Sequence, residues 1–377
     1  MNQTPLELGT LSVTPVDRTG FDIGWDHGHH GLVPPPELLH ADTPVYQGWM
    51  AAKAVFGRRT LASQRSTRQW LQLRLLAWRR GIAFDTQQLT PNFLRQIHTE
   101  RCPVRRCALG GPASHPDAAV VERLNPQAGY AAGNLAVMSA QAAAACAGTS
   151  AMQAARHARA AEACGEAVQG LDAATWWRVA ALGAFATPLP FAEVARLPLA
   201  VLPPNRVRLL NAAQGLQALV TLLFTAPGWS DRCRAFGLLL PAHTLRHDFN
   251  LFVGAMAPRV LEAGNDSAAL RHALEDAWLL ERVQRRWMHL VLSLGEAATE
   301  ALLARAAEAP VPGVRILCHA PDQAVEGWAL PQAGCTPPHA VKRDVPVTRR
   351  TARLSGMAIQ AGRQGTVPPP AAPARHA

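Results

Sequence analysis

The sequence has few charged and few aromatic residues, and it lacks a long uninterrupted apolar run. Of its 377 residues, 17% are charged and 6% are aromatic. The longest apolar candidate, residues 216–226, is interrupted by Gln217 and Thr221. It falls short of the roughly 18 residues that a membrane span requires. We therefore expect no contact with a membrane, and we expect residues 216–226 to form a buried helix.

Two further absences concern the cellular compartment. The first ten residues, MNQTPLELGT, contain neither the basic region nor the apolar core of a signal peptide. The seven cysteines are odd in number and scattered, so they do not form a disulfide framework. Both features fit a reducing compartment, and we expect a cytoplasmic location.

Acidic residues are the scarcer sign of charge. The chain has 37 Lys and Arg against 27 Asp and Glu, a net charge of +10. Such an excess favours an anionic partner, of which nucleic acid is the usual one. The segment 53–80 contains no acid and carries these candidate phosphate-binding residues: Arg58, Arg59, Arg65, Arg68, Arg74, Arg79 and Arg80. The tail after residue 340 is also rich in Arg.

The remaining composition predicts a mainly α protein, with a small ββα segment and a disordered basic C-terminal tail. Proline and glycine are frequent in residues 1–48, for which we expect an irregular arm. Residues 49–90 should be a basic helical region, 91–150 the ββα segment, 151–335 an α-helical domain and 336–377 the tail. Helices are expected at Gln69–Arg80, Ala173–Ala186 after the cap Asp172, Arg206–Phe224 after the cap Asn205, 267–294 and Glu296–Glu308.

The ββα segment is predicted from its turns and short apolar runs. Residues 120–124 form a β-type run, 125–130 supply turn residues, and 135–138 form a second apolar run. Ser139 is a good N-cap for a helix over residues 140–147. The order strand, turn, strand, helix follows.

The residues of this segment resemble a known family. The runs Glu-Arg-Leu-Asn at 122–125 and Gly-Tyr-Ala-Ala-Gly-Asn at 129–134 resemble the ββα-metal core of HNH-type endonucleases. The likeness covers about 50 residues, 98–148, and it implies a treble-clef-type fold. An HNH enzyme hydrolyses a phosphodiester with one divalent cation, Mg²⁺ or Mn²⁺, and a base that deprotonates water.

The resemblance assigns roles to individual residues. Glu122 takes the place of the metal-binding acid, Arg123 stands where such enzymes have the histidine base, and Asn134 is the middle asparagine. His115, seven residues before Glu122, is a candidate substitute base. The helix departs from the family pattern. The family usually has an asparagine and a lysine near the positions of Ala143 and Cys146.

Metal-ligating residues are sparse elsewhere. Many HNH domains bind a structural zinc ion with two Cys-x-x-Cys pairs, whereas this chain has Cys102 and Cys107 with four residues between them. These two cysteines, with His98, are the candidate zinc ligands; the alternative is that the cysteines are small buried apolar residues. Pairs on one helix face, such as His243 with His247 and His272 with Glu275, are weaker metal candidates.

Three functions remain open. The favoured hypothesis is a nucleic-acid-binding protein, of DNA in particular, derived from an HNH endonuclease and weakly active or inactive. The second is an active metal-dependent endonuclease. The third is a helical interaction or scaffold protein without enzymatic activity. The first is favoured because binding requires only surface positive charge, whereas catalysis requires a base and a ligated metal.

Overall fold

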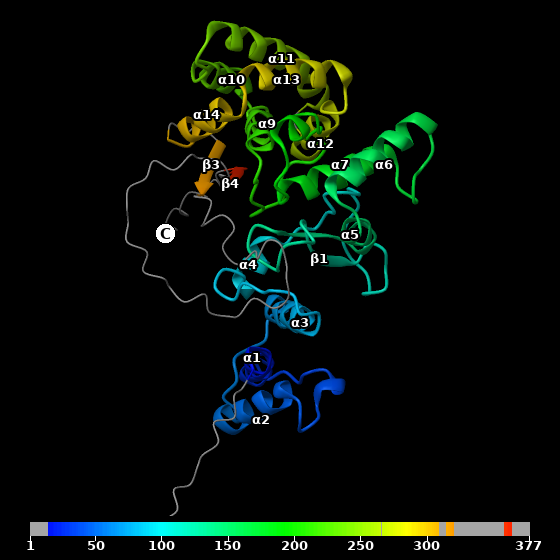
Figure 1. The fold of residues 1–377 in the computed structure, drawn as a ribbon, viewed down its shortest axis with the longest axis vertical. Coiled ribbons are helices and arrows are strands. Elements are labelled where there is room, and N and C mark those ends of the chain that lie inside the picture. Colours follow the sequence, from blue (N-terminus) through cyan, green and yellow to red (C-terminus); the bar gives the residue numbers. More distant parts are fainter. Residues whose placement is uncertain (1–13, 265, 309–313, 320–357, 364–377) are drawn as a thin grey trace, which may run out of the picture. The chain divides into compact units, whose positions relative to one another are not determined.

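The computed structural model describes residues 14–264, 266–308, 314–319 and 358–363 (Figure 1). The protein is mainly helical, as predicted, with small two-stranded antiparallel sheets. The chain divides into two compact units, which we describe separately. Unit 1 contains the described residues up to 96 together with 127–132, and unit 2 contains the remaining described residues.

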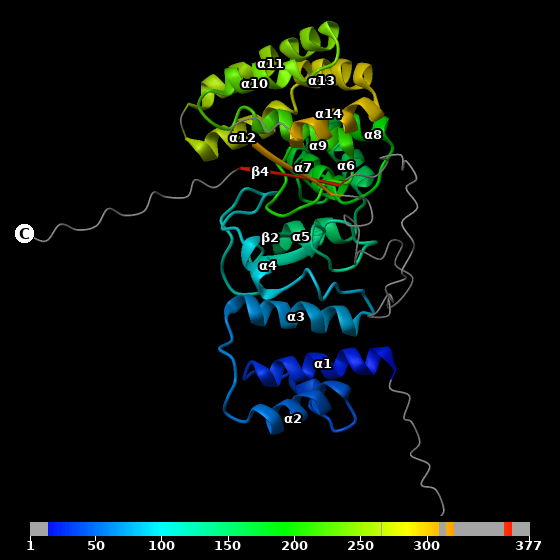
Figure 2. The ribbon, with the colours of Figure 1, turned by 90° about the vertical axis from the view of Figure 1, so that its left-hand side faces the viewer.

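Unit 1 is a set of packed helices: α1 (Pro15–His29), α2 (Pro44–Phe56), α3 (Arg65–Arg79) and the short α4 (Pro91–Gln96), with a 3₁₀ turn at Pro36–Leu38. Figures 1 and 2 show α1 between α2 and α3. Ile23, Val45 and Leu75 form its apolar centre, one from each helix. The Trp78 indole also donates a hydrogen bond to the carbonyl of Val16, at 2.9 Å.

The irregular N-terminal arm predicted for residues 1–48 is wrong over its described part, because α1 and the start of α2 lie there. Thr14 caps α1 by accepting from the Asp17 N–H, and Pro15 begins the helix, where proline is tolerated. Gly31, with a φ of 64°, lies in the turn after α1, but the glycines within the two helices serve close packing. A Cβ atom at Gly24 would overlap the carbonyl of Val45, and one at Gly48 would overlap the carbonyl of Phe21.

The α1–α2 contacts advance in the same direction along both helices. Gly20 lies against Pro44, and Gly28, two turns later, lies against Ala52. The two helices are therefore parallel, and the loop between them returns the chain. Small residues four apart on facing helices allow this close approach of backbones.

The predicted helix Gln69–Arg80 is present as α3, one turn longer at its start. Trp70 donates from its indole N–H to the carbonyl of Leu89 at 2.8 Å. The loop after α3 pairs with Tyr130, whose N–H donates to Ala83 and whose carbonyl accepts from Asp85, both at 2.8 Å.

Unit 2 begins with the predicted ββα arrangement. Strands β1 (Ala119–Arg123) and β2 (Leu135–Ser139) pair antiparallel, with Val121 opposite Val137 and Glu122 opposite Ala136. Helix α5 (Ala140–Ala147) follows directly. Its N-cap is Ser139, as predicted, and the Ser139 hydroxyl accepts from the Ala142 N–H at 3.3 Å.

The rest of unit 2 is helical. Its elements are α6 (Ala151–Cys164), α7 (Ala173–Phe185), α8 (Phe191–Ala195), α9 (Ala212–Leu222), α10 (Trp229–Leu238), α11 (His243–Ala263), α12 (Ser267–Ala277), α13 (Glu281–Leu294) and α14 (Glu296–Glu308). Helices α6 and α7 pack as a pair, and α11 packs on α12 and α13 (Figure 2). The buried rings of Phe252, Trp278 and Trp287 meet where these last helices converge.

Several predicted boundaries need correction. Asp172 does cap α7, and α14 has the predicted limits. Asn205 does not begin a helix: α9 starts at Ala212, and Arg206 has a left-handed φ of 66°. The helix predicted over 267–294 is two helices, because the chain turns after Ala277 and the Gln284 side chain donates to the Trp278 carbonyl at 2.7 Å.

A second sheet lies within regions predicted to be helical or disordered. Strand β3 (Val314–His319) pairs antiparallel with β4 (Ala358–Arg363). The prediction of a disordered tail is therefore wrong for 358–363, since pairing with β3 provides the backbone hydrogen bonds of that segment. The other residues of the predicted tail lie outside the described part of the chain. No helix in the described part is long and apolar enough to cross a bilayer.

Candidate functional site

The ββα segment is preceded by a tight turn that brings Cys102 and Cys107 together. The Cys102 N–H donates to the Cys107 carbonyl at 2.9 Å, and the Arg106 N–H donates to the Cys102 carbonyl at 2.8 Å. Arg106 has a φ of 58°, a left-handed value that a non-glycine residue rarely adopts. We call residues 102–107 the cysteine turn.

Each thiol of the cysteine turn has a protein partner. The Cys102 sulfur accepts from the Ser139 and Arg105 N–H groups at 3.3 and 3.4 Å, which fixes the turn against the start of α5. The Cys107 thiol donates to the Asp117 carboxylate at 3.2 Å. Burial, followed by this hydrogen bond, raises the pKa of Cys107 to about 11. The Cys107 thiol is therefore neutral at physiological pH in this arrangement.

Glu122, the candidate metal-binding acid, lies half-buried on β1. Its carboxylate accepts from the N–H of Arg123 at 3.0 Å. Cys146 on α5 is buried, and burial raises its pKa to about 12, with a contribution from the negative charge of Glu122. The Cys146 thiol near Glu122 is therefore neutral and does not compensate the negative charge of the Glu122 carboxylate.

Arg123, which the resemblance places at the position of the base, contacts the loop between the strands. Its guanidinium donates to the Pro126 carbonyl at 3.0 Å. A guanidinium has no acceptor and stays protonated, so Arg123 cannot take a proton from water.

Asn134 is fully buried and closes the same loop. Its side-chain oxygen accepts from the Asn125 N–H at 2.9 Å, and its amide donates to the Asn125 carbonyl at 3.2 Å. Asn125 in turn donates to the Ala186 carbonyl at 2.9 Å. Asn134 thus orders the loop between β1 and β2 and anchors it, through Asn125, to the end of α7.

His115, the candidate substitute base, lies in the loop before β1 with half of its side chain exposed. Its Nδ1 accepts from the Asp117 N–H at 3.2 Å and lies 3.9 Å from the Asp117 carboxylate. Arg105 forms an ion pair with the same carboxylate. The cluster lowers the pKa of Asp117, chiefly through the hydrogen bond from Cys107 and then through Arg105. The interactions of His115 are thus with Asp117, and Glu122 is not among them.

The described residues do not gather a metal site. No group of three or more His, Cys, Asp or Glu side chains in the described ranges is placed to bind an ion. Cys102 and Cys107 are adjacent, yet their sulfurs are engaged by Ser139 and Asp117, and His98 completes no set with them. The zinc ion and the catalytic Mg²⁺ or Mn²⁺ therefore stay predictions.

The candidate phosphate-binding arginines of unit 1 fall into two groups. Arg74 is buried, paired with Asp26, and stacked 4.5 Å from the centre of the Trp70 ring. The prediction that it is a surface contact is wrong, because the helix turns it inward. Arg58, Arg59, Arg65, Arg68, Arg79 and Arg80 are exposed. Of these six, Arg79 alone has an ion pair among the described residues, with Glu37 at 2.9 Å.

Arg65, Arg68, Gln72 and Arg79 occupy the exposed side of α3 at helical spacing. Arg58 and Arg59 lie in the exposed loop that leads into this helix. We call the exposed residues Arg58, Arg59, Arg65, Arg68 and Arg79 the arginine stripe.

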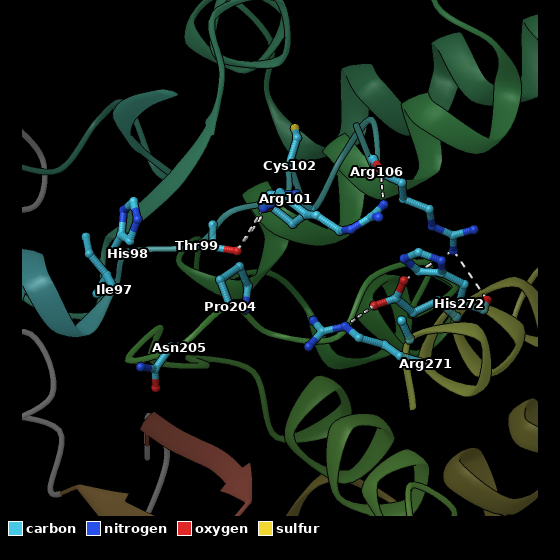
Figure 3. A pocket seen from close by; sticks show the side chains of 13 residues that line it. Ile97, His98, Thr99, Arg101, Cys102, Arg106, Pro204, Asn205, Arg271 and His272 are labelled. Atoms are coloured by element: carbon cyan, nitrogen blue, oxygen red, sulfur yellow. Dashed lines mark hydrogen bonds and ion pairs between the residues drawn. The ribbon is translucent and has the colours of Figure 1, made fainter. Parts of the chain in front are cut away.

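A pocket of about 310 Å³ in unit 2 was not predicted. The cysteine turn and the segment before it form one wall, and α12 and residues 204–205 form others (Figure 3). The charged side chains that line it include Arg101, Arg106, Arg271 and Glu275. The sequence predicts His272 and Glu275 as a pair on one helix face, but no local pattern indicates that residues about 170 positions earlier face them.

Glu275 is the centre of an ion-pair network at this pocket. One carboxylate oxygen accepts from the Leu202 N–H at 2.9 Å and from Arg271 at 3.0 Å, and the other accepts from Arg106 at 3.2 Å. Asp276 accepts from Arg106 at 2.7 Å and from Arg178 at 3.3 Å. Burial lowers the pKa of Arg178, and the neighbouring charge of Arg106 lowers it further.

Comparison with known proteins adds no family to this picture: no family model matches the sequence, and no curated protein or solved structure is significantly similar to it.

Proposed function

We propose that this protein binds nucleic acid, DNA in particular, and that its HNH-like ββα segment is weakly active or inactive as a nuclease. The observation that supports binding most directly is the arginine stripe of unit 1. Apart from Arg79, which pairs with Glu37, the arginines of the stripe form no ion pair with a described residue. Such cations attract phosphates more strongly than cations that are already paired.

The geometry of α3 suits a phosphate backbone. Fifteen residues of α-helix extend about 22 Å, and the duplex carries one phosphate charge per roughly 1.7 Å of its axis. Arg65 and Arg68 are three residues apart on the same face, and Arg79 lies near the other end of the helix. Arginine also donates two parallel hydrogen bonds to phosphate oxygens.

The residues of the ββα segment support the proposal of weak or absent hydrolytic activity. General-base catalysis requires a group that accepts a proton, and Arg123 at that position is a permanent cation. Asn134 is buried and bonded to Asn125 on both its amide atoms. In this proposal the ββα segment therefore has a structural role, and its own loop contacts order it.

The test is fluorescence anisotropy of a labelled DNA duplex with the full chain, over a range of salt concentrations. We expect affinity to fall as salt rises, because binding releases counterions from the phosphates. The double variant R65A/R68A should bind at least about tenfold more weakly, and its salt slope should be smaller by about 0.9 for each phosphate that the two arginines neutralise in the native chain.

The matched control is R282A/R286A on α13. These two arginines are also exposed, lie four apart on a helix and have no ion pair among the described residues. The control removes the same net charge from a different surface. If the stripe is the binding surface, the control should therefore leave DNA affinity within about twofold. Equal losses of affinity in the two variants would instead indicate diffuse attraction, and absence of a complex at low salt would favour a scaffold role.

A plasmid-nicking assay with Mg²⁺ or Mn²⁺ tests the catalytic part of the proposal. We expect little or no cleavage, and any residual cleavage should be unchanged in E122Q if it arises from a contaminant. Clear nicking that E122Q abolishes would establish the active endonuclease instead.

A further inference from the structure

We infer that the pocket of unit 2 binds a phosphate monoester through Arg101 and Arg271. This site is distinct from the arginine stripe, and the inference does not depend on the proposed function. Its lining comes from the cysteine turn and the residues before it, from 204–205, and from α12. Figure 3 shows Arg101 and Arg106 on the segment of the cysteine turn and Arg271 on a separate segment, α12.

The charges around the pocket do not balance. Three guanidinium groups line the pocket, those of Arg101, Arg106 and Arg271, against one lining carboxylate, that of Glu275. The lining therefore carries an excess of two positive charges. A phosphate monoester carries about −1.5 to −2 at neutral pH, so it would neutralise this excess, whereas a carboxylate would neutralise only part of it.

Two of the arginines retain donors for a ligand. Arg101 is exposed, and its side chain makes one long hydrogen bond, 3.3 Å, to the Arg106 carbonyl; it forms no ion pair with a described residue. Arg271 uses Nε for Glu275 and one terminal nitrogen for the Leu202 carbonyl, at 3.0 Å each. Its other terminal nitrogen bonds to no described residue. By contrast, Arg106 is committed to Asp276 and Glu275.

The rest of the lining suits an organic substituent. Ile97, Pro103, Pro204 and Ala268 contribute apolar surface, and His98 and His272 contribute imidazoles. Burial, followed by the charge of Arg106, lowers the pKa of His272, so it presents a neutral ring at physiological pH. A volume of about 310 Å³ exceeds what inorganic phosphate fills and lies at the lower end of small-ligand pockets.

The monoester could belong to a free metabolite or to the 5′ end of a nucleic acid strand, and the experiment separates the two. Isothermal titration of the full chain would use AMP, glucose 6-phosphate, and a short DNA strand with and without a 5′-phosphate. Adenosine and glucose serve as probes that lack the phosphate. We expect at least one phosphorylated probe to bind and its unphosphorylated counterpart to bind at least about tenfold more weakly.

The variant R101Q tests the site itself, because Arg101 supports no ion pair among the described residues. It should weaken binding by about tenfold or more, which is the effect of losing a hydrogen bond to a charged group, with an unchanged melting temperature. R282Q on α13 is the matched control and should bind as the native chain does. R271Q should weaken binding too, and it should also lower the melting temperature because it removes a hydrogen bond to the buried Glu275 carboxylate.

The inference is overturned if no phosphorylated probe binds more tightly than its unphosphorylated counterpart, or if R101Q binds as tightly as R282Q. Binding of the 5′-phosphorylated strand alone would identify a strand end as the source. Binding of AMP or glucose 6-phosphate would identify a free metabolite.

Discussion

Arg106 combines an unfavourable backbone with favourable side-chain contacts. Its φ of 58° costs a non-glycine residue about 1 kcal/mol relative to glycine. Its guanidinium nevertheless joins the cysteine turn to Asp276 and Glu275 of α12, which is 170 residues away in sequence. The ion pairs therefore hold the turn in a conformation that the backbone alone would not favour.

Two substitutions separate these opposing effects. R106A keeps the left-handed backbone cost and removes the ion pairs, which leaves the buried carboxylate of Glu275 with Arg271 as its remaining cation. We expect a loss of roughly 2–4 kcal/mol in the free energy of unfolding. R106G loses the same ion pairs but relieves the backbone cost, so it should be about 1 kcal/mol less destabilised than R106A in urea denaturation. Equal losses of stability would show that the turn relaxes away from its left-handed conformation.

At the scale of elements, the crossing of α1 and α2 depends on glycine. In α1, a side chain at Gly24 has no room beside the backbone of α2, since a Cβ atom would overlap the Val45 carbonyl. In α11, Gly254 lies in open space, where a Cβ atom would meet nothing within 4 Å. The same substitution therefore has opposite effects in the two helices.

We expect G24A to destabilise the protein by at least about 2 kcal/mol, because overpacking forces the helices apart. G254A should stabilise it by about 0.5–1 kcal/mol, because alanine has the higher helix propensity and fewer unfolded conformations. Chemical denaturation of the two variants measures both changes. A neutral G24A would mean that α1 and α2 adjust their separation at little cost.

The elements that the sequence predicted correctly are those specified by neighbouring residues. Asp172 caps α7 and Ser139 caps α5, because a side-chain oxygen needs only the N–H groups that follow it. The strands β1 and β2 were found from short apolar runs around a turn. Helix α1 was missed because its glycines favour a turn locally, and their role depends on contacts with α2.

The site was less predictable than the fold, for a related reason. Asn134, Arg123 and Glu122 are predicted from the resemblance of residues 122–134 to a family motif. The bonds of Asn134 to Asn125 and of Arg123 to Pro126 show loop-closing roles that a motif does not reveal. Arg74 was expected on the surface, and only the packing of α3 on α1 places it beside Asp26. The pocket required residues near 101, 204 and 271 to meet, which no local pattern indicates.

At the scale of the whole molecule, the acidic and basic side chains have different partners in the two units. In unit 2, Glu275 and Asp276 are surrounded by arginines, and the pKa of Asp276 is lowered despite its burial, through the hydrogen bond and charge of Arg106. In unit 1, exposed arginines have few partners among the described residues, and burial lowers the pKa of His27 and of His30 at the end of α1. The two units should therefore respond to acid over different ranges of pH.

The sign of the response in unit 1 follows from burial. Loss of solvent is the main cause that lowers the pKa of His27, with Arg74 and His30 adding to it and the Ile23 carbonyl and Asp26 opposing it; burial and His29 lower that of His30. Because the folded pKa lies below the unfolded value of 6.5, the unfolded chain binds protons first as pH falls. Stability from these histidines is therefore complete above about pH 6.5 and is lost as pH falls toward their folded pKa values.

Each of the two histidines should remove up to about 1.4 kcal/mol of stability per pH unit in that window. Hydrogen exchange, corrected for intrinsic rates, should show protection in α1 and α2 falling as the pH drops below about 6.5. The carboxylate network around Asp276 loses its stabilisation only below about pH 4, because its pKa is lowered from 3.8. The variant H27Q, which cannot be protonated, should flatten the decline in α1. A decline of the same steepness in H27Q would assign the acid sensitivity to groups other than His27.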